Sequence, residues 1–111
     1  MGEKLRGQLT ESMFYVLMAF LDAERCGIDV AEFVRQRTKG RLHMGPGTIY
    51  TLLAKFQSEG LIVETEVDEG GRKRTYALTE KGRSTFMEEL DRLRSCVEDG
   101  EEELQCGRSH Q

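Results

Sequence analysis

Small, hydroxylated and basic residues share one stretch near the middle of the chain. From Pro46 it runs PGTIYTLLAKFQSE, with no acidic residue before Glu59. Proline suits the first position of a helix, and the unbonded N–H groups at a helix start attract anions. Glycine lets a phosphate approach the backbone, while hydroxyl and ammonium groups donate to phosphates or base edges. The candidate contacts on this stretch are Gly47, Thr48, Tyr50, Thr51 and Lys55.

Two basic clusters flank this stretch. Residues 35–43 hold four basic side chains and His43 without an acid, and residues 72–74 read RKR. Such clusters could follow a nucleic-acid backbone, but both are also compatible with solvated loops that bind nothing. The candidate contacts are Arg41 and His43 from the first cluster, and Arg72, Lys73 and Arg74 from the second.

The total charge hides an uneven distribution. The 111 residues carry a formal net charge of -4, which alone argues against a nucleic-acid-binding domain. Residues 1–83, however, hold 13 basic and 12 acidic side chains, whereas residues 84–111 hold 3 and 8. Because binding depends on local potential, the net charge does not exclude a DNA-binding face.

The spacing of apolar residues indicates the elements that must position these groups. It predicts helices over residues 10–25, 29–38 and 46–59, with Thr10 or Ser12 and then Asp29 as caps. Alternating runs follow, LIVETEV and RTYALT, joined by a glycine-containing turn, and they predict a hairpin. Thr79 is expected to cap a final helix.

Three helices followed by a hairpin are typical of a winged helix-turn-helix, a mainly α (α+β) fold. Its third helix enters the major groove, and the hairpin is the wing. We expect residues 1–80 to form this DNA-binding domain. Residues 81–111 are expected to form a C-terminal dimerisation helix, ended or frayed by Gly100 and the EDGEEE run, and an acidic, partly disordered tail.

A narrow apolar seam on the final helix indicates a homodimer. Its residues are spaced four, three and four apart, as in a coiled coil, although such a seam could also belong to the core of one chain. The first helix carries extra apolar surface that would complete the interface. The candidate interface residues are Phe14, Met18, Phe86, Leu90, Leu93 and Val97.

The segments PGTIYTLLAKFQSEGLI and GGRKRTYALTEKGR together resemble the PadR family of bacterial transcriptional regulators. Members start the recognition helix with Pro-Gly-Ser/Thr-hydrophobic-Tyr and end the wing on Tyr-x-Leu-Thr-x-x-Gly. The resemblance covers residues 10–98. It implies a homodimeric repressor that binds double-stranded DNA at a pseudo-palindromic operator and loses affinity when a small hydrophobic effector binds. An effector cavity could involve Met13, Met18 and Met87, which could equally be core residues.

Other classes of protein fit the sequence poorly. It shows no nucleophile–base pair, phosphate loop or spaced metal ligands, so we expect neither an enzyme nor a cofactor. It has no apolar run of membrane-spanning length and no secretory signal. The three cysteines are odd in number and form no CxxC pair, which favours a cytoplasmic protein. Cys96 could act as an intersubunit redox switch, but an inert thiol is the simpler reading. A winged-helix adaptor that binds protein instead of DNA remains the alternative.

Overall fold

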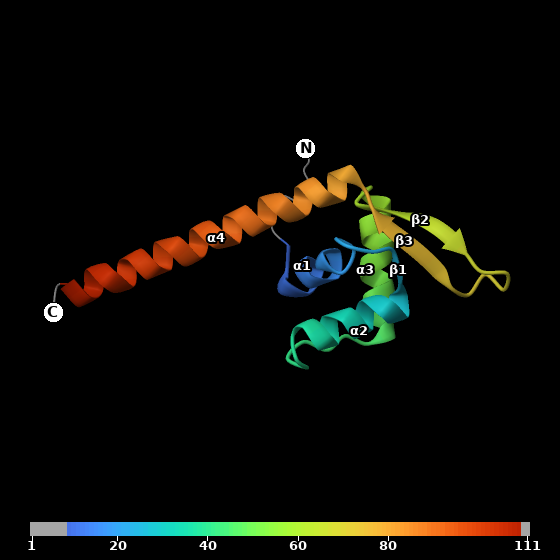
Figure 1. Cartoon of the computed structure of the whole chain (residues 1–111), viewed down its shortest axis with the longest axis horizontal. Helices are drawn as coiled ribbons and strands as arrows, with labels where there is room; N and C mark the ends of the chain where they lie inside the picture. The colour runs from blue at the N-terminus through green and yellow to red at the C-terminus, as the bar shows by residue number, and fades with distance from the viewer. Residues whose placement is uncertain (1–8, 110–111) are drawn as a thin grey trace.

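The computed structural model describes residues 9–109 and has the expected order of elements, with one added strand (Figure 1). The chain is α+β, and its three helices and hairpin form a winged helix-turn-helix followed by a long C-terminal helix, as predicted. The elements are α1 (Glu11–Met18), β1 (Arg25–Cys26), α2 (Gly27–Arg37), α3 (Pro46–Ser58), β2 (Ile62–Val67), β3 (Arg74–Leu78) and α4 (Glu80–Ser109).

Helix α1 is shorter than its apolar spacing predicted. Thr10 caps it as expected, since its hydroxyl accepts a hydrogen bond from the backbone N–H of Met13 at 3.1 Å. The helix ends at Met18, so the expected helix to residue 25 is wrong. The Arg25 Nε atom donates to the carbonyl of Ala19 at 2.5 Å, and this bond satisfies a carbonyl at the helix end while the chain turns back.

Helix α2 begins earlier than predicted, because a short strand leads directly into it. Arg25 and Cys26 pair antiparallel with Tyr76 and Thr75 of β3, and Cys26 is the N-cap of α2. Asp29 lies in the first turn of the helix and is not its cap, which corrects the expected start. A strand of two residues is too short to show periodicity, so β1 could not be predicted from the spacing of residues.

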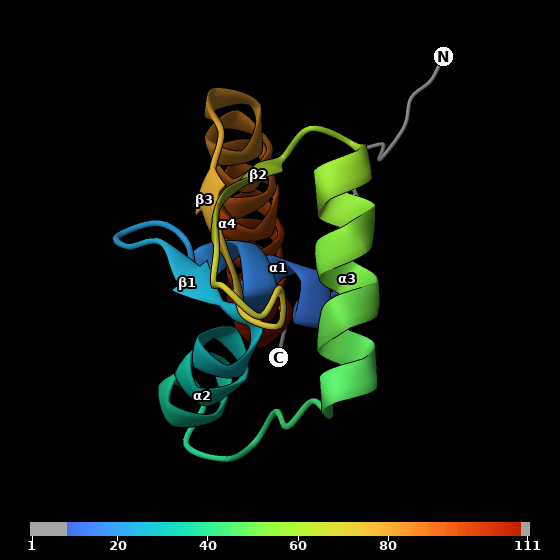
Figure 2. The ribbon, with the colours of Figure 1, turned by 90° about the vertical axis from the view of Figure 1, so that its right-hand side faces the viewer.

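The sheet has the order β1-β3-β2, and β2 and β3 form the predicted hairpin. Their register shifts between Glu64 and Glu66, so Thr65 makes an irregularity in the edge strand. In Figure 2 α1 lies behind the sheet and α3, and the chain passes from the end of α3 into β2, which packs against that helix. In Figure 1 the hairpin extends from the body beyond α3, and it forms the wing.

The core lies where α1, α2 and α3 meet the base of the sheet. Each helix turns its apolar face inward, so the side chains on that face are buried or half-buried. The largest fully buried side chains are Phe56, Leu17, Ile49, Leu53, Leu61, Ile62, Val16, Val30 and Val34.

The end of α3 and the start of α4 are locked together. Gly60, with φ of 79°, ends α3, and the N–H groups of Gly60 and Leu61 donate to the carbonyls of Gln57 and Phe56, a Schellman arrangement. The Thr79 hydroxyl donates to the Gly60 carbonyl at 2.7 Å and accepts from the Gly82 N–H at 3.0 Å. The predicted Thr79 cap is therefore confirmed, and the same hydroxyl links the start of α4 to the end of α3.

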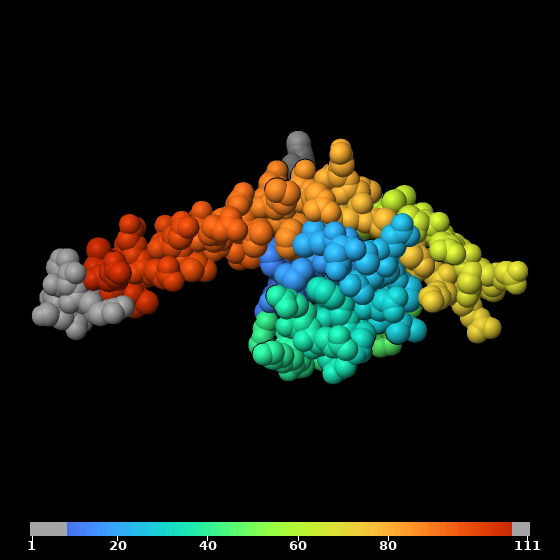
Figure 3. Space-filling model, viewed as in Figure 1, coloured from blue at the N-terminus to red at the C-terminus, as the bar shows by residue number. Residues whose placement is uncertain are grey.

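Helix α4 runs for 30 residues and leaves the body of the molecule (Figures 1 and 3). It continues through Gly100 to Ser109, so the expectation that the acidic run ends the helix is wrong, as is a disordered tail within the described residues. A glycine inside a helix destabilises it by only about 1 kcal/mol relative to alanine. The glutamates around Gly100 are good helix formers, so the helix can continue through this position. His110 and Gln111 lie outside the described residues.

Candidate nucleic-acid interface

The N-terminus of α3 is open. Pro46 occupies the first turn, the N-cap residue Gly45 makes no side-chain cap, and the first turn holds no acidic residue. The partial positive charge of the helix start and its backbone N–H groups are therefore available to an anion. This arrangement fits the phosphate contact that the sequence predicts for this helix.

Helix α3 presents a small, polar face to solvent. Ile49, Leu53 and Phe56 are buried, whereas Gly47, Thr48, Thr51 and Lys55 are exposed and follow one side of the helix. A shallow hollow runs along Gly47, Thr48, Thr51 and the half-buried Leu52. We call Gly47, Thr48, Thr51 and Lys55 the α3 face. Apart from the long side chain of Lys55, it has no large group that would keep a base edge from approaching the helix.

One charge on the α3 face is partly compensated. The Lys55 ammonium lies 3.4 Å from a carboxylate oxygen of Glu59, one helical turn further along. Both side chains are partly exposed, so water and salt screen the attraction and it is weak. A phosphate could therefore replace Glu59 as the partner of Lys55 at little cost.

Tyr50 points in a different direction from the α3 face. Its ring reaches α2 and lies against the backbone of Gly27, although half of the residue's surface remains exposed. The sequence grouped Tyr50 with Thr48 and Thr51. The structure separates it from them and places it in the gap between the two helices.

The basic cluster before α3 divides into paired and unpaired side chains. Arg41 forms an ion pair with Glu11 at 2.5 Å, and its guanidinium lies 5.9 Å from the centre of the Tyr15 ring. Hydrogen bonding to Glu11 raises the pKa of Arg41. His43 is exposed. Arg41 is therefore held by α1, and a DNA contact would have to compete with this pair.

Two further basic residues of that cluster have no such partner. Arg37 and Lys39 are exposed and make no ion pair with the other described residues, whereas Arg35 pairs with Glu32 at 2.5 Å. The sequence showed the cluster as a whole but could not show which members are paired. Arg37 and Lys39 therefore join His43 as candidates for backbone contact.

The wing holds its turn through one carboxylate. A side-chain oxygen of Asp68 accepts hydrogen bonds from the backbone N–H groups of Arg72 at 2.9 Å and Lys73 at 3.1 Å. The bond from Lys73 is the main cause of a lowered Asp68 pKa. This bracing keeps Arg72 and Lys73, both exposed, at the end of the hairpin.

Only part of the predicted wing cluster is available as positive charge. Arg74 lies 2.9 Å from Glu64 on the neighbouring strand, so its charge is compensated within the sheet. Arg72 and Lys73 make no ion pair with the other described residues. The wing's unpaired charge therefore rests on these two side chains.

The predicted interface residues fall into two groups. The rings of Phe14 and Phe86 stack with centroids 4.7 Å apart, and both residues are buried within one chain. They attach α4 to α1 and present little surface to a second chain. Met18 and Leu93 are half-buried, while Leu90 and Val97 are exposed by 37% and 58%.

The exposed seam continues further than the sequence analysis took it. Leu104, 64% exposed, lies seven residues beyond Val97. Gly100 and Gly107 share this side of α4, since all these positions follow the three-four spacing of a coiled coil. We call Leu90, Leu93, Val97 and Leu104 the α4 seam.

Residues 16–88 match the family model described as "Transcriptional regulator PadR-like family". The matched stretch covers most of the core, the α3 face, the wing and the start of α4. This chain belongs to the PadR-like family. The resemblance noted in the sequence is thereby confirmed, and family membership makes the chain a DNA-binding regulator of transcription and not an enzyme.

Solved structures with the same fold support this assignment of architecture. A transcriptional regulator from Clostridium thermocellum is 16% identical over 88% of this chain and 94% of its own, with a TM-score of 0.73. Bacillus subtilis PadR, solved with operator DNA, is 22% identical over 70% of this chain and 45% of its own, with a TM-score of 0.62.

A third neighbour is BpsR of Bordetella bronchiseptica, whose DNA binding is regulated by 6-hydroxynicotinic acid. It is 18% identical over 86% of this chain and 67% of its own, with a TM-score of 0.67. No match was found among curated protein sequences.

Within residues 9–109, this PadR-like chain has no group of three or more potential metal ligands. Across the same residues, every helix is too short or too polar to cross a membrane. Cys26 is buried, and Cys96 and Cys106 are exposed on α4.

Proposed function

We propose that this PadR-like protein is a cytoplasmic homodimeric repressor that binds a pseudo-palindromic operator and is released by a small-molecule effector. The observation that carries the proposal is the open N-terminus of α3, followed by the small, hydroxylated α3 face. A helix of this kind can enter a major groove with its first turns against the base edges.

The charges near α3 suit contact with the DNA backbone on both sides of the groove. Arg72 and Lys73 stand at the end of the wing, and His43 and Lys39 precede α3. Each contact with a phosphate releases counterions, so binding should weaken steeply as salt is added. Arg41 and Arg74 contribute less in this proposal, because Glu11 and Glu64 already compensate them.

The α4 seam supports a homodimer. Its apolar side chains lie along a helix that leaves the body of the molecule, and three of them, Leu90, Val97 and Leu104, are exposed (Figure 3). A second copy would cover the seam, and the glycines at positions 100 and 107 would let the two helices approach closely. A two-fold dimer presents two α3 faces, which predicts half-sites about 10 base pairs apart.

Release by an effector is proposed from the family and from one neighbour. BpsR shares the fold, and its DNA binding responds to a small aromatic acid. An effector acts only if it binds the DNA-competent and DNA-free states with different affinity.

Selection from a random DNA library tests the proposal. The full-length protein is incubated with the library at moderate salt, and bound sequences are amplified over successive rounds and sequenced. We expect a motif with two inverted half-sites separated by about one helical turn. Recovery of sequences without any shared motif contradicts the proposal and favours an adaptor that binds protein.

A further inference from the structure

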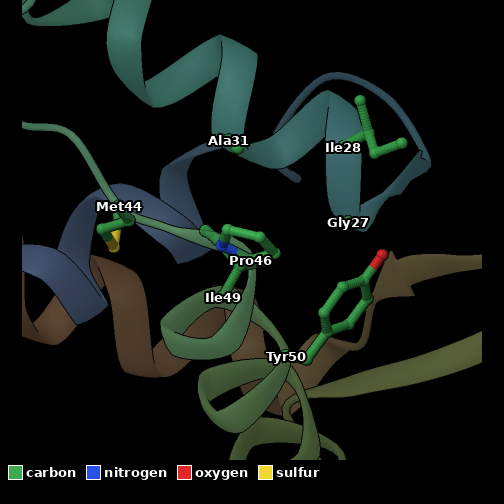
Figure 4. A pocket seen from close by; sticks show the side chains of 7 residues that line it. All are labelled: Gly27, Ile28, Ala31, Met44, Pro46, Ile49 and Tyr50. Atoms are coloured by element: carbon green, nitrogen blue, oxygen red, sulfur yellow. The ribbon is translucent and has the colours of Figure 1, made fainter.

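An apolar cavity of about 140 Å³ lies between the N-terminal ends of α2 and α3 (Figure 4). Ile28 and Ala31 of α2 form one side, Pro46 and Tyr50 of α3 form the other, and Met44 lies at the inner end. The Tyr50 hydroxyl is the one polar side-chain group on its lining. This cavity is distant from the α4 seam and was not foreseen from the sequence.

We propose that this cavity binds an uncharged single-ring aromatic molecule, and that its occupancy lowers the protein's affinity for DNA. The inference rests on the proposed DNA-binding function and adds to it the place and chemical class of the effector. It departs from the methionine-lined site considered for Met13, Met18 and Met87, of which Met13 is buried and Met87 lies exposed on α4.

The size and shape of the cavity argue for one aromatic ring. An apolar protein cavity of about 150 Å³ accommodates benzene, and the cavity between α2 and α3 has a similar volume. The Tyr50 ring lines the cavity, and aromatic rings gain from offset or edge contacts with another aromatic ring. Larger fused ring systems would exceed the available volume.

The lining also argues against a charged ligand. No side chain that lines the cavity carries a charge, so a carboxylate or ammonium placed inside would lose its hydration without gaining a partner. One hydrogen bond is available, to the Tyr50 hydroxyl. A neutral ring with at most a small polar substituent is therefore the class that the cavity selects.

The position of the cavity explains how a ligand would affect DNA binding. Pro46 and Tyr50 belong to the first turns of α3, directly beside Gly47 and Thr48 of the α3 face. The Tyr50 ring packs against Gly27, so a ligand bound beside it contacts both the ring and the start of α3 and can change their position relative to α2. Ile28, 74% exposed, leaves the cavity open to solvent on this side.

Nuclear magnetic resonance of methyl groups tests the binding step without DNA. Benzene is titrated into the full-length protein labelled at isoleucine, alanine and methionine methyls. We expect saturable shifts at Ile28, Ala31, Met44 and Ile49, which all line the cavity. Shifts concentrated on α4 methyls such as Met87, or no saturation up to the solubility of benzene, overturn the proposal.

A filled cavity provides the matched control. Ala31→Leu adds bulk inside the cavity, whereas Ala23→Leu makes the same change on an exposed loop. We expect Ala31→Leu to weaken benzene binding at least about tenfold and Ala23→Leu to leave it unchanged. Should Ala31→Leu fail to fold, Ile28→Ala removes lining area at an exposed position and is expected to weaken binding severalfold.

Competition against DNA tests the regulatory step. If ligand and DNA exclude each other, benzene at nine times its dissociation constant raises the apparent Kd for the selected operator about tenfold. Saturable binding in the cavity with an unchanged Kd overturns this step. Loss of DNA affinity in Ala31→Leu with no benzene binding by the unsubstituted protein shows a DNA contact instead of an effector site. Failure to bind any operator leaves the benzene titration to judge the cavity by itself.

Discussion

The ring of Tyr50 occupies the space that a Cβ atom would fill at Gly27. A Cβ placed there would lie 2.7 Å from the Tyr50 Cε1 atom, closer than any ordinary contact. The two residues join the starts of α2 and α3, the helices of the helix-turn-helix. A glycine fits at position 27 because the Tyr50 ring leaves no room for a Cβ atom, and not because the backbone there needs a positive φ.

Replacing Gly27 by alanine should weaken DNA binding. The new methyl group must push the Tyr50 ring aside and disturb the start of α3, so we expect the operator Kd to rise severalfold while the fold persists. Fluorescence anisotropy measures the effect. In a Tyr50→Ala background the same substitution should not raise the operator Kd further, because the clash is gone. An equal rise of Kd in both backgrounds contradicts this account.

Lys55→Ala should weaken binding to all DNA sequences alike. The ammonium is expected to contact a phosphate, so its loss should reduce the slope of log Kd against log salt by about one. Glu59→Gln is the companion variant: it removes the partner of Lys55 and should tighten binding modestly. An unchanged affinity and salt slope in Lys55→Ala would mean that this side of α3 faces away from DNA.

Gly82→Ala should destabilise the fold markedly. A Cβ at this position would lie 2.1 Å from the Leu61 carbonyl oxygen, which is backbone and cannot move aside cheaply. We expect a loss of roughly 1–3 kcal/mol, as for other overpacked sites, measured by urea unfolding. Gly47→Ala is the control, since no atom lies within 4 Å of a Cβ there, and its stability should be unchanged or slightly higher.

How far the sequence predicted this molecule depends on the range of the interactions involved. The helix starts at Thr10 and Pro46, the hairpin, and the Thr79 cap follow from residues close together in the chain, and the structure has them all. The early end of α1 depends on Arg25 bonding back to Ala19, and β1 is visible only as a partner of β3. Neither leaves a periodic signal.

The candidate site shows the same division. Exposure of Thr48, Thr51 and Lys55 follows from their place on one side of a helix. The pairing of Arg41 with Glu11 and of Arg74 with Glu64 joins residues 30 and 10 positions apart, and no local rule indicates it. The turn of Tyr50 toward Gly27 likewise requires the packing of α2 on α3.

Val97→Glu should convert the protein to monomers. Val97 is 58% exposed at the middle of the α4 seam, so glutamate would not disturb a single chain but would bring two carboxylates into the proposed interface. Sedimentation equilibrium distinguishes the states. Ser95→Glu, on the other side of the helix, adds the same charge and should remain dimeric. A Val97→Glu protein that stays dimeric would show that the α4 seam is not the contact.

The wing should loosen in acid. Backbone hydrogen bonds hold the Asp68 pKa below its ordinary value, so Asp68 stabilises the turn at neutral pH. That stabilisation is full above about pH 3.9, the unfolded value, and is lost as the pH falls through the lower folded pKa. Carbon-13 titration should give a midpoint below the ordinary range, and the Lys73 amide should exchange faster in Asp68→Asn. A midpoint at or above that range contradicts the turn geometry.

Relative affinity for the selected operator and a shuffled duplex of equal composition tests the central claim most directly. Anisotropy titrations of both duplexes with the full-length protein, at two salt concentrations, give four dissociation constants. We predict that, at the higher salt, the protein binds the operator about a thousandfold more tightly than the shuffled duplex. The affinity for each duplex should fall as the salt concentration rises. Equal affinity for the two duplexes at both salts would contradict the claim that the α3 face reads DNA sequence.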